Sequence, residues 1–328
     1  MQKIRWGILG CGKIANKFAG DLKHVRDAEL VAVGARDGER ARSFAAAYGA
    51  AHAFDSYEGL VSSPLVDVIY VATPHGFHHE HALLCLRHGK AVLCEKALAL
   101  NLRQVKEMIE ESKRSNVFLM EAFWTKFLPQ YQKMLSLVSD GTIGEVRMVQ
   151  ADFGFNGGDT PAQRLYDPAL GGGSLLDVGI YPVFLATSLL GRPVNVNGIM
   201  DAYDTGVDRQ IAISLQFDSG ALASLSASFE VDTPVAATII GTRGYIQMKN
   251  RFHNATCELE MVIGRDNPQA IDVLREEGYG YQFEARHVTE CLRDGVKESP
   301  VMSFNDSILL METLDRIRDR CGIRYAVD

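Results

Sequence analysis

The sequence lacks the features that mark membrane and secreted proteins. We find no uninterrupted apolar run of the roughly 18 residues that a membrane span requires. The start of the chain does not combine a charged segment, an apolar segment and a cleavage site, as a signal peptide does. The six cysteines form no Cys-x-x-Cys pair and no framework spacing, which is typical of reduced thiols in a protein core. We therefore expect a cytoplasmic protein.

The sequence also lacks an excess of positive charge. Its 34 lysines and arginines stand against 41 aspartates and glutamates, which gives a formal net charge of −7 at pH 7. No basic stripe is available to follow a phosphate backbone, so nucleic acid is excluded as a partner on electrostatic grounds. We see no low-complexity segment and no repeat at a fixed period. A small molecule is the partner that this composition favours.

The 328 residues are too many for one comfortable core, so two domains are expected. The first third alternates short apolar runs with segments of helical period, which predicts a parallel sheet with helices on both faces. The expected strands cover residues 4–9, 30–34, 53–54, 68–72, 91–94 and 117–120. Because crossovers between parallel strands are right-handed, the doubly wound Rossmann order is favoured.

After residue 145 the pattern becomes antiparallel. Residues 209–217 and 221–229 each alternate apolar with polar positions on either side of a turn. An earlier strand is expected at 146–155, and a helix at 175–190 separates it from this pair of strands.

We divide the chain near Phe123. Residues 1–122 form an α/β Rossmann domain, and residues 123–328 form an α+β domain for substrate binding and oligomerisation, with a large, mainly antiparallel, open-faced sheet. A sheet with helices on one face leaves the other face to be covered, and the small residues of strand 222–227 suit packing against a second copy. We expect a homodimer or a higher homo-oligomer.

A glycine motif follows the first strand. Gly10-Cys11-Gly12-Lys13-Ile14-Ala15 fits G-x-G-x-x-[GA] between a strand and a helix, where glycines let a pyrophosphate approach the helix N-terminus. We expect Gly10, Gly12, Lys13 and Ile14 to bind a dinucleotide. The alternative is a tight structural turn.

The end of the second strand indicates which dinucleotide binds. A carboxylate there binds the ribose 2′-hydroxyl of NAD, whereas an arginine accommodates the 2′-phosphate of NADP. The strand is followed by Arg36-Asp37. Arg36 can stack on adenine while its guanidinium meets a phosphate, and Asp37 is placed to cap the next helix. NADP is favoured; NAD, with Asp37 as the ribose ligand, is the alternative.

Three further motifs complete a pattern. They are Ala72-Thr73-Pro74 followed by His78, then Cys94-Glu95-Lys96-Ala97, and then Gly171-Gly172-Gly173 leading to Asp177-Val178-Gly179-Ile180-Tyr181. With the glycine motif, their order and spacing resemble the Gfo/Idh/MocA oxidoreductase family nearly end to end. The tyrosine at 181 and the run Glu121-Ala122-Phe123-Trp124 resemble its branch of dimeric dihydrodiol dehydrogenases and NADP-dependent D-xylose dehydrogenases.

The resemblance implies residue roles. Lys96 and Tyr181 would carry proton transfer, and Asp177 would hold the substrate hydroxyl. The cofactor would be lined by Ala72, Thr73, Pro74 and Glu95, together with Lys96, and His78 would lie near the nicotinamide. The resemblance also implies a dimer.

The chemistry supports these roles independently. Removing hydride from a carbinol carbon requires a base for the hydroxyl proton, and an unassisted tyrosine with a pKa of about 10 is a poor base at neutral pH. An ammonium from Lys96 would stabilise the tyrosinate, and Asp177 shares a helix face with Tyr181 because it lies four residues earlier. The alternative makes Lys96 a surface charge and Tyr181 a core aromatic.

We therefore predict an NAD(P)-dependent dehydrogenase or reductase acting on CH–OH groups. It would transfer hydride between NADP(H) and a secondary alcohol or hemiacetal carbon of a sugar, cyclitol or trans-dihydrodiol. The alternative is a non-catalytic NADP-binding sensor of the same fold.

One residue departs from the family pattern. The family has Glu-Lys-Pro where this chain has Glu95-Lys96-Ala97. If the proline version aims the lysine through a cis bond, Ala97 either keeps that bond or shifts Lys96, and the sequence leaves both open.

Other residues are weaker candidates. The histidines at 75, 78, 79 and 81 could suggest zinc, but no thiolate or carboxylate set completes a tetrahedral site, so we expect no metal. The aromatic residues Trp124, Phe127, Phe153 and Phe155 are candidates for either core or pocket, and we take Trp124 and Phe155 as substrate-binding. Arg164 is placed among the cofactor ligands, although it could instead reach the substrate or be a surface charge.

Overall fold

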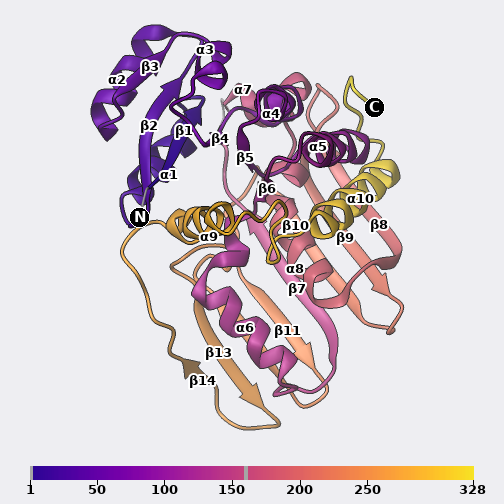
Figure 1. The fold of residues 1–328 in the computed structure, drawn as a ribbon. Helices are drawn as coiled ribbons and strands as arrows, with labels where there is room; N and C mark the ends of the chain where they lie inside the picture. Colours follow the sequence, from indigo (N-terminus) through magenta and orange to yellow (C-terminus); the bar gives the residue numbers. More distant parts are fainter. Residues whose placement is uncertain (1–2, 159–161) are drawn as a thin grey trace. The chain divides into compact units, whose positions relative to one another are not determined.

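The computed structural model describes residues 3–158 and 162–328. The chain forms two compact units (Figure 1). Unit 1 contains Met1–Phe127 and Glu276–Ser307, and unit 2 contains Leu128–Arg275 and Ile308–Asp328. The sequence suggested a single division after residue 122, whereas in the structure a late segment of the chain returns to the first unit.

Unit 1 is built on a six-stranded parallel sheet. Its strands are β1 (Ile4–Leu9), β2 (Ala28–Gly34), β3 (His52–Phe54), β4 (Val68–Val71), β5 (Ala91–Glu95) and β6 (Leu119–Ala122). Their order is β3-β2-β1-β4-β5-β6, the doubly wound order that the sequence predicted. Strands β4 and β5 are buried throughout, as expected for a sheet covered on both faces.

Side-chain caps mark the start of three helices of unit 1, which are α2, α3 and α5. The helices are η1 (His75–Phe77), η2 (Trp124–Phe127), α1 (Lys13–Leu22), α2 (Gly38–Tyr48), α3 (Tyr57–Ser62), α4 (His78–Arg87), α5 (Leu102–Ser115) and α9 (Tyr281–Arg293). The Asn101 side chain accepts from the backbone N–H of Gln104, and α5 ends at Asn116, which has the left-handed conformation.

A buried aspartate ties α9 to unit 1. Asp21, on α1, accepts from the backbone N–H groups of Tyr279, Gly280 and Tyr281 at distances of 2.9–3.0 Å, across as many as 260 residues of chain. These are N–H groups that a helix leaves unsatisfied at its start. At the other side of the contact, the indole N–H of Trp6 donates to Thr289 on α9 at 3.3 Å. These bonds explain why the late segment belongs to the first unit.

Unit 2 is built on an eight-stranded sheet. Its strands are β7 (Val146–Gly154), β8 (Pro193–Ala202), β9 (Asp208–Phe217), β10 (Leu222–Ser228), β11 (Ala237–Gly241), β12 (Gly244–Lys249), β13 (Glu258–Ile263) and β14 (Gln269–Ile271). The order is β14-β13-β12-β11-β7-β10-β9-β8, and β10 pairs with β7 in parallel while the other pairs are antiparallel.

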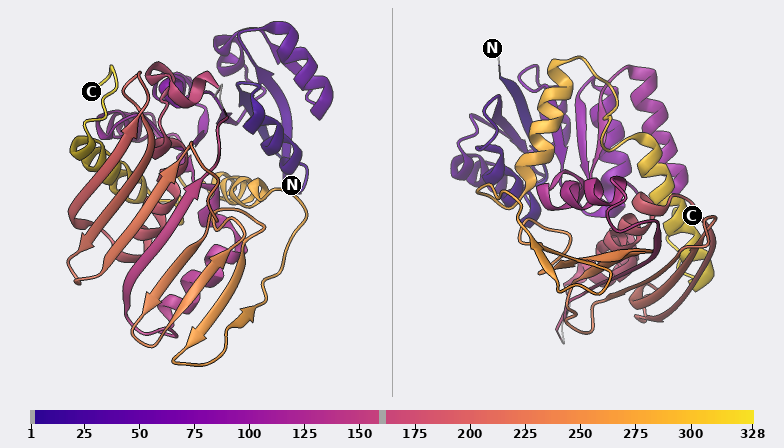
Figure 2. Two further views of the ribbon diagram at one scale, coloured as in Figure 1. Left: turned by 180° about the vertical axis from the view of Figure 1, so that it is seen from behind. Right: turned by 90° about the horizontal axis from the view of Figure 1, so that it is seen from below.

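Helices lie against one face of this sheet. They are η3 (Pro168–Leu170), η4 (Leu175–Gly179), α6 (Pro129–Ser139), α7 (Gln163–Tyr166), α8 (Ile180–Leu190) and most of α10 (Phe304–Cys321), whose first residues belong to unit 1. The left view of Figure 2 looks onto the opposite face, with α6, α8 and α10 behind the strands. Strand β9 alternates buried and exposed side chains, as predicted for a half-buried strand.

One helical stretch is more apolar than the sequence analysis recognised. Residues 168–190 have the length and hydropathy of a membrane span, although 78% of the most apolar window is buried inside the protein. The sequence shows no uninterrupted apolar run there, because glycines and single polar residues interrupt residues 168–190. Its burial is that of a core helix.

We predict that Asp21→Ala destabilises unit 1. The substitution removes the charged acceptor of three backbone N–H groups, two of which are buried, so the free energy of unfolding should fall on the order of 3 kcal/mol. Both tryptophans, Trp6 and Trp124, belong to unit 1, so tryptophan fluorescence during urea unfolding reports on this unit.

The matched control is Asp27→Ala. Asp27 pairs with Arg293 at the other end of α9, but both side chains are partly exposed, and such a pair contributes less than about 1 kcal/mol. Equal losses in the two variants would contradict the importance that we give to the Asp21 cap.

Candidate functional site

The glycine turn after β1 is closely packed. Gly10 has φ +96°, and a Cβ there would lie 3.1 Å from Thr73 Cγ2 and 3.2 Å from the Ala72 carbonyl oxygen. Gly12 begins α1, and no side chain in the described part of the chain caps that helix. Its first N–H groups can therefore bind an anionic group such as a pyrophosphate.

The parallel sheet gathers the other cofactor candidates at one edge. In register, Leu9 lies beside both Gly34 and Val71, and Val71 lies beside Cys94. Parallel strands end at the same edge, so the segments after β1, β2, β4 and β5 meet there. The predicted residues on these segments are Gly10, Gly12, Lys13, Ile14, Arg36, Ala72, Thr73, Pro74, Glu95 and Lys96.

The two residues after β2 have separate surroundings. Asp37 Oδ1 accepts from the backbone N–H groups of Glu39 (2.9 Å) and Arg40 (3.2 Å), which makes it the N-cap of α2, as predicted. Arg36 instead lines a cavity of about 390 Å³, together with Asp55, Ser56, Tyr57, Glu58, Thr73, Pro74, Phe77, Glu80, His81 and Leu84.

Arg40 brings a second guanidinium to this end of the sheet, and the sequence analysis missed it. Its Nε and Nη2 donate to the carbonyl oxygen of Cys11 at 3.0 and 2.6 Å, so it braces the glycine turn. The available signal was the position of Arg40 in the first turn of α2, four residues after Arg36.

His81 faces the same cavity without adding a charge. Its Nδ1 lies 3.0 Å from Thr73 Oγ1, and its ring meets Tyr57 edge-on. Burial, with a smaller contribution from the nearby Arg36 guanidinium, lowers the pKa of His81 to about 4. At neutral pH the imidazole is uncharged, so Arg36 is the cation among the residues lining this cavity.

His78 ties two strand ends together. It is completely buried, with Nδ1 2.7 Å from the Ala97 carbonyl oxygen and Nε2 2.7 Å from the Thr73 carbonyl oxygen. Burial lowers its pKa to about 4 despite these two acceptors. A neutral imidazole has a single N–H, so His78 donates to one of these two carbonyl oxygens, and its ring lies between the segments that follow β4 and β5.

The Lys96–Ala97 peptide bond is cis. Ala97 therefore has the geometry that the sequence analysis considered for the family's proline. The backbone N–H of the next residue, Leu98, donates to Glu121 Oε1 at 3.0 Å. Glu121 is buried, and burial raises its pKa to about 7. In the sequence, Glu121 stands out only as part of a family motif. No pattern in the sequence indicates its contact with the turn that carries Lys96.

Further aromatic and acidic groups surround this end of unit 1. Trp124 is buried and stacks on Tyr281, with ring centroids 4.5 Å apart. The phenol of Tyr70 donates to Glu95 Oε1. Phe127 packs against His287 at 5.0 Å. Trp124 therefore packs within its own unit, and 7% of its surface remains exposed.

In unit 2, Asp177 and Tyr181 lie on one helical stretch. Its first part, Leu175–Gly179, is a π-helix, and α8 follows directly. Pro182 explains the wide turn, because a proline has no N–H to donate to the Val178 carbonyl and its ring clashes with that oxygen in a regular α-helix. The sequence predicted the helix but not this widening.

Asp177 is held by an arginine. Arg164 Nη1 donates to Asp177 Oδ2 at 2.8 Å, and the arginine side chain remains 54% exposed. The structure thus places Arg164, a predicted cofactor ligand, beside the predicted substrate ligand. Part of the loop before it, residues 159–161, lies outside the described residues.

Tyr181 sits in an aromatic group. Its ring centroid is 5.6 Å from that of Phe153 and 4.8 Å from that of His253, and the latter two rings stack at 4.2 Å. His253 follows β12, and no motif in the sequence marked it. Phe155 packs beside Phe229 at 5.0 Å.

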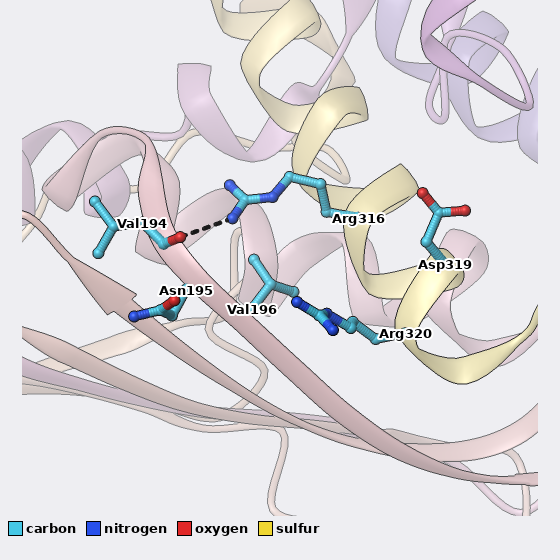
Figure 3. A pocket seen from close by; sticks show the side chains of 6 residues that line it. All are labelled: Val194, Asn195, Val196, Arg316, Asp319 and Arg320. Atoms are coloured by element: carbon cyan, nitrogen blue, oxygen red, sulfur yellow. Dashed lines mark hydrogen bonds between the residues drawn. The ribbon is translucent and has the colours of Figure 1, made fainter.

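The described residues contain no group of three or more His, Cys, Asp or Glu side chains arranged to hold a metal. The cavity in Figure 3 is also separate from the predicted residues. It has about 340 Å³ and is lined by Val194, Asn195, Val196, Arg316, Asp319 and Arg320. Arg316 donates to the carbonyl oxygens of Pro193 (2.5 Å) and Val194 (3.0 Å), so it joins α10 to the edge strand β8.

The chain is similar to known oxidoreductases over nearly its whole length. It is 38% identical to a trans-1,2-dihydrobenzene-1,2-diol dehydrogenase of Xenopus tropicalis, over 98% of this chain and 99% of that protein. The corresponding protein of Homo sapiens is 37% identical over 99% of both chains.

Solved structures agree. An aldose-aldose oxidoreductase from Caulobacter crescentus has a TM-score of 0.90 at 26% identity, covering 98% of each chain. A 3-ketoreductase from Actinomadura kijaniata, crystallised with NADP and TDP-benzene, has a TM-score of 0.86 at 25% identity, again covering 98% of each chain.

Two family patterns match this sequence. Residues 4–123 match "Oxidoreductase family, NAD-binding Rossmann fold", and residues 131–247 match "GFO/IDH/MocA C-terminal domain". Together with the doubly wound unit and the open-faced sheet, these matches show that the chain belongs to the Gfo/Idh/MocA family of oxidoreductases, and it is a dehydrogenase of CH–OH groups.

Proposed function

We propose that the protein transfers hydride between NADP(H) and a secondary alcohol or hemiacetal carbon of a sugar, cyclitol or trans-dihydrodiol. The activities for which its relatives are named support this range, because they concern a dihydrodiol, aldoses and a keto group. The observation that carries the proposal is the candidate cofactor edge of unit 1, where an uncapped helix N-terminus and an arginine-lined cavity follow neighbouring strands.

The surroundings of Arg36 and Asp37 support NADP over NAD. Asp37 is engaged in capping α2, whereas Arg36 lines the cavity beside it. A guanidinium binds a 2′-phosphate well because it offers several donors in one plane. Arg40, which braces the glycine turn, adds positive charge at the same strand end. In the A. kijaniata structure the bound cofactor is NADP.

The proposed chemistry uses residues of both units. NADP would accept the hydride, and Tyr181 would take the hydroxyl proton, with the Lys96 ammonium stabilising the tyrosinate. Asp177 would hold the substrate hydroxyl, and its bond to Arg164 fixes the carboxylate orientation. The remaining exposed donors of Arg164 can serve the cofactor or the substrate. Trp124 and Phe155 are proposed substrate contacts.

We also propose a cytoplasmic homodimer. All six cysteines are free thiols, which suits a reducing compartment. The outer face of the eight-stranded sheet carries an apolar row in which Leu222 lies beside Met148, Met148 beside Ile240 and Ile240 beside Tyr245. Leu222 is 46% exposed. A second copy is the partner that we propose for this face, because β10, the strand that carries Leu222, also carries small residues that allow close approach.

The first experiment tests the cofactor. We expect NADPH to bind at least about tenfold more tightly than NADH in a fluorescence titration, and we expect Arg36→Ala to abolish most of that preference, since a charge-assisted phosphate contact is worth about 1.5–3 kcal/mol. Arg42→Ala is the control and should keep the preference, because Arg42 is an exposed arginine on α2, the helix that follows Arg36. Preference for NADH in the wild type would refute the assignment to NADP.

The second experiment tests turnover. With NADP and a panel of aldoses, cyclitols and dihydrodiols, we expect the wild type to be active. Tyr181→Phe should lower kcat by about 10²-fold or more, because it removes the proton acceptor. The dissociation constant for NADPH should stay within about twofold of the wild type. Tight NADPH binding without oxidation of any substrate would instead favour a sensor.

The third experiment tests the dimer. Size-exclusion chromatography with light scattering should give twice the chain mass of 36.1 kDa at micromolar concentration. Ser224→Arg, on the exposed face of β10, should give monomers because it places an unpaired charge in the proposed interface. Ser136→Arg, on the exposed side of α6, is the control and should remain dimeric. A monomeric wild type would contradict this proposal.

A further inference from the structure

The helix with Asp177 and Tyr181 starts from a glycine turn that is unusually confined. Gly171 and Gly173 have φ of +74° and +114°, which favours glycine at both positions. A Cβ on Gly173 would also lie only 2.5 Å from Asp208 Oδ1. Two separate constraints therefore require glycine at position 173, namely its backbone conformation and the close approach of the Asp208 carboxylate.

Asp208 holds the N–H side of this turn. It is the first residue of β9 and is completely buried. Its Oδ2 accepts from Ser174 Oγ and from the backbone N–H of Leu175, each at 2.6 Å. Among the described residues, Oδ1 has no hydrogen-bond partner. The carboxylate thus sits where the unsatisfied N–H groups and the positive end of the helix lie.

Tyr325 holds the carbonyl side of the same turn. Its buried phenol donates to the Gly172 carbonyl oxygen at 2.7 Å. The tyrosine is itself fixed, because the Arg318 guanidinium lies 4.9 Å from its ring centroid and Asp328 accepts from both Arg318 and the Tyr325 backbone N–H at 2.8 Å. Residues from β9 and from the last segment of the chain therefore bind two nearby peptide groups of one turn, the one after Gly172 and the one before Leu175.

Burying a charged aspartate costs desolvation free energy unless hydrogen bonds or ion pairs compensate for it. Burial raises the pKa of Asp208 to about 6, so it is ionised at neutral pH while shielded from water. Only one of its two oxygens is satisfied by the turn. A carboxylate retained under these conditions points to a requirement for the geometry that its bonds impose.

We propose that Asp208 and Tyr325 are positioning residues for the hydride-transfer reaction, because together they fix where the helix carrying Asp177 and Tyr181 begins. This inference rests on the proposed function. Asp177 lies two residues after Leu175, and Tyr181 lies one turn further on, so a shift at the start of the helix moves both side chains. A misplacement of about 1 Å can cost about 10²-fold in rate.

The test compares Asp208→Ala, Asp208→Asn and Tyr325→Phe. We expect Asp208→Ala to lower kcat by about 10- to 100-fold and Tyr325→Phe by about 3- to 10-fold. Asp208→Asn retains a carbonyl oxygen for Leu175 and should recover most of the activity. The dissociation constant for NADPH should stay within about twofold in every variant, because the proposed cofactor edge belongs to unit 1.

Tyr131→Phe is the matched control. Tyr131, on α6, is also buried, and its hydroxyl lies 2.5 Å from Ser188 Oγ near the far end of α8. The substitution therefore removes a tyrosine hydroxyl that contacts α8 without touching the start of that helix. It should leave kcat within about twofold of the wild type. A loss equal to that of Tyr325→Phe would overturn the inference, since general loosening of the helix would then suffice.

Hydrogen exchange separates this inference from the proposed function. Peptides covering residues 174–181 should exchange faster in Asp208→Ala and Tyr325→Phe than in the wild type. An active wild type with unchanged kcat in these variants would overturn the positioning role alone, as would an Asn variant as impaired as the Ala variant. If Asp208→Ala does not fold, Tyr325→Phe and Asp208→Asn decide by the same criteria. A wild type without any turnover would overturn both proposals.

Discussion

Parallel pairing is the constraint on which the first unit depends. Six strands that run in one direction must all end at one edge, and each return crossing needs a helix that starts near that edge. For this reason the sheet brings together segments that are spread over almost ninety residues of chain. They are the glycine turn, Arg36, the Thr73 segment and Lys96. None of these side chains needs to contact another for the edge to form. Their common location is a property of the sheet.

Carboxylates, all of them buried except Asp37, then refine the positions that the sheet leaves open. Three of them accept backbone N–H groups at the start of a helix, and they are Asp21, Asp37 and Asp208. The fourth, Glu121, accepts a backbone N–H beside the turn that carries Lys96. A carboxylate can satisfy two or three such groups at once, which a neutral side chain cannot do equally well. Their burial has a cost in desolvation, and the backbone bonds offset it.

The parts of this structure that sequence reasoning predicted are the local ones. Buried parallel strands appear as short apolar runs between turn residues, and the caps by Asp37 and Asn101 involve groups only two or three residues away. The contacts that were not predicted join residues far apart in the chain. These contacts depend on how whole elements pack, for which no spacing rule exists. They join Asp21 to α9, Asp208 to the glycine turn before Asp177, and His253 to Tyr181. Pro182 is a local signal for the π-helix. A proline predicts such a wide turn only if the helix is known to continue past it, and otherwise it can equally indicate a helix end.

The division of the chain between the units has a consequence for its synthesis. Unit 1 needs α9, which begins at Tyr281, and unit 2 needs residues after Ile308, so neither is complete until the last part of the chain has been made. At roughly 5–20 residues per second, the ribosome takes on the order of ten seconds or more to reach α9 after completing β6. Throughout that interval Trp6 and Asp21 lack the helix that covers them. We therefore expect the nascent chain to engage chaperones over this stretch, and we expect a fragment that ends after β6 to aggregate.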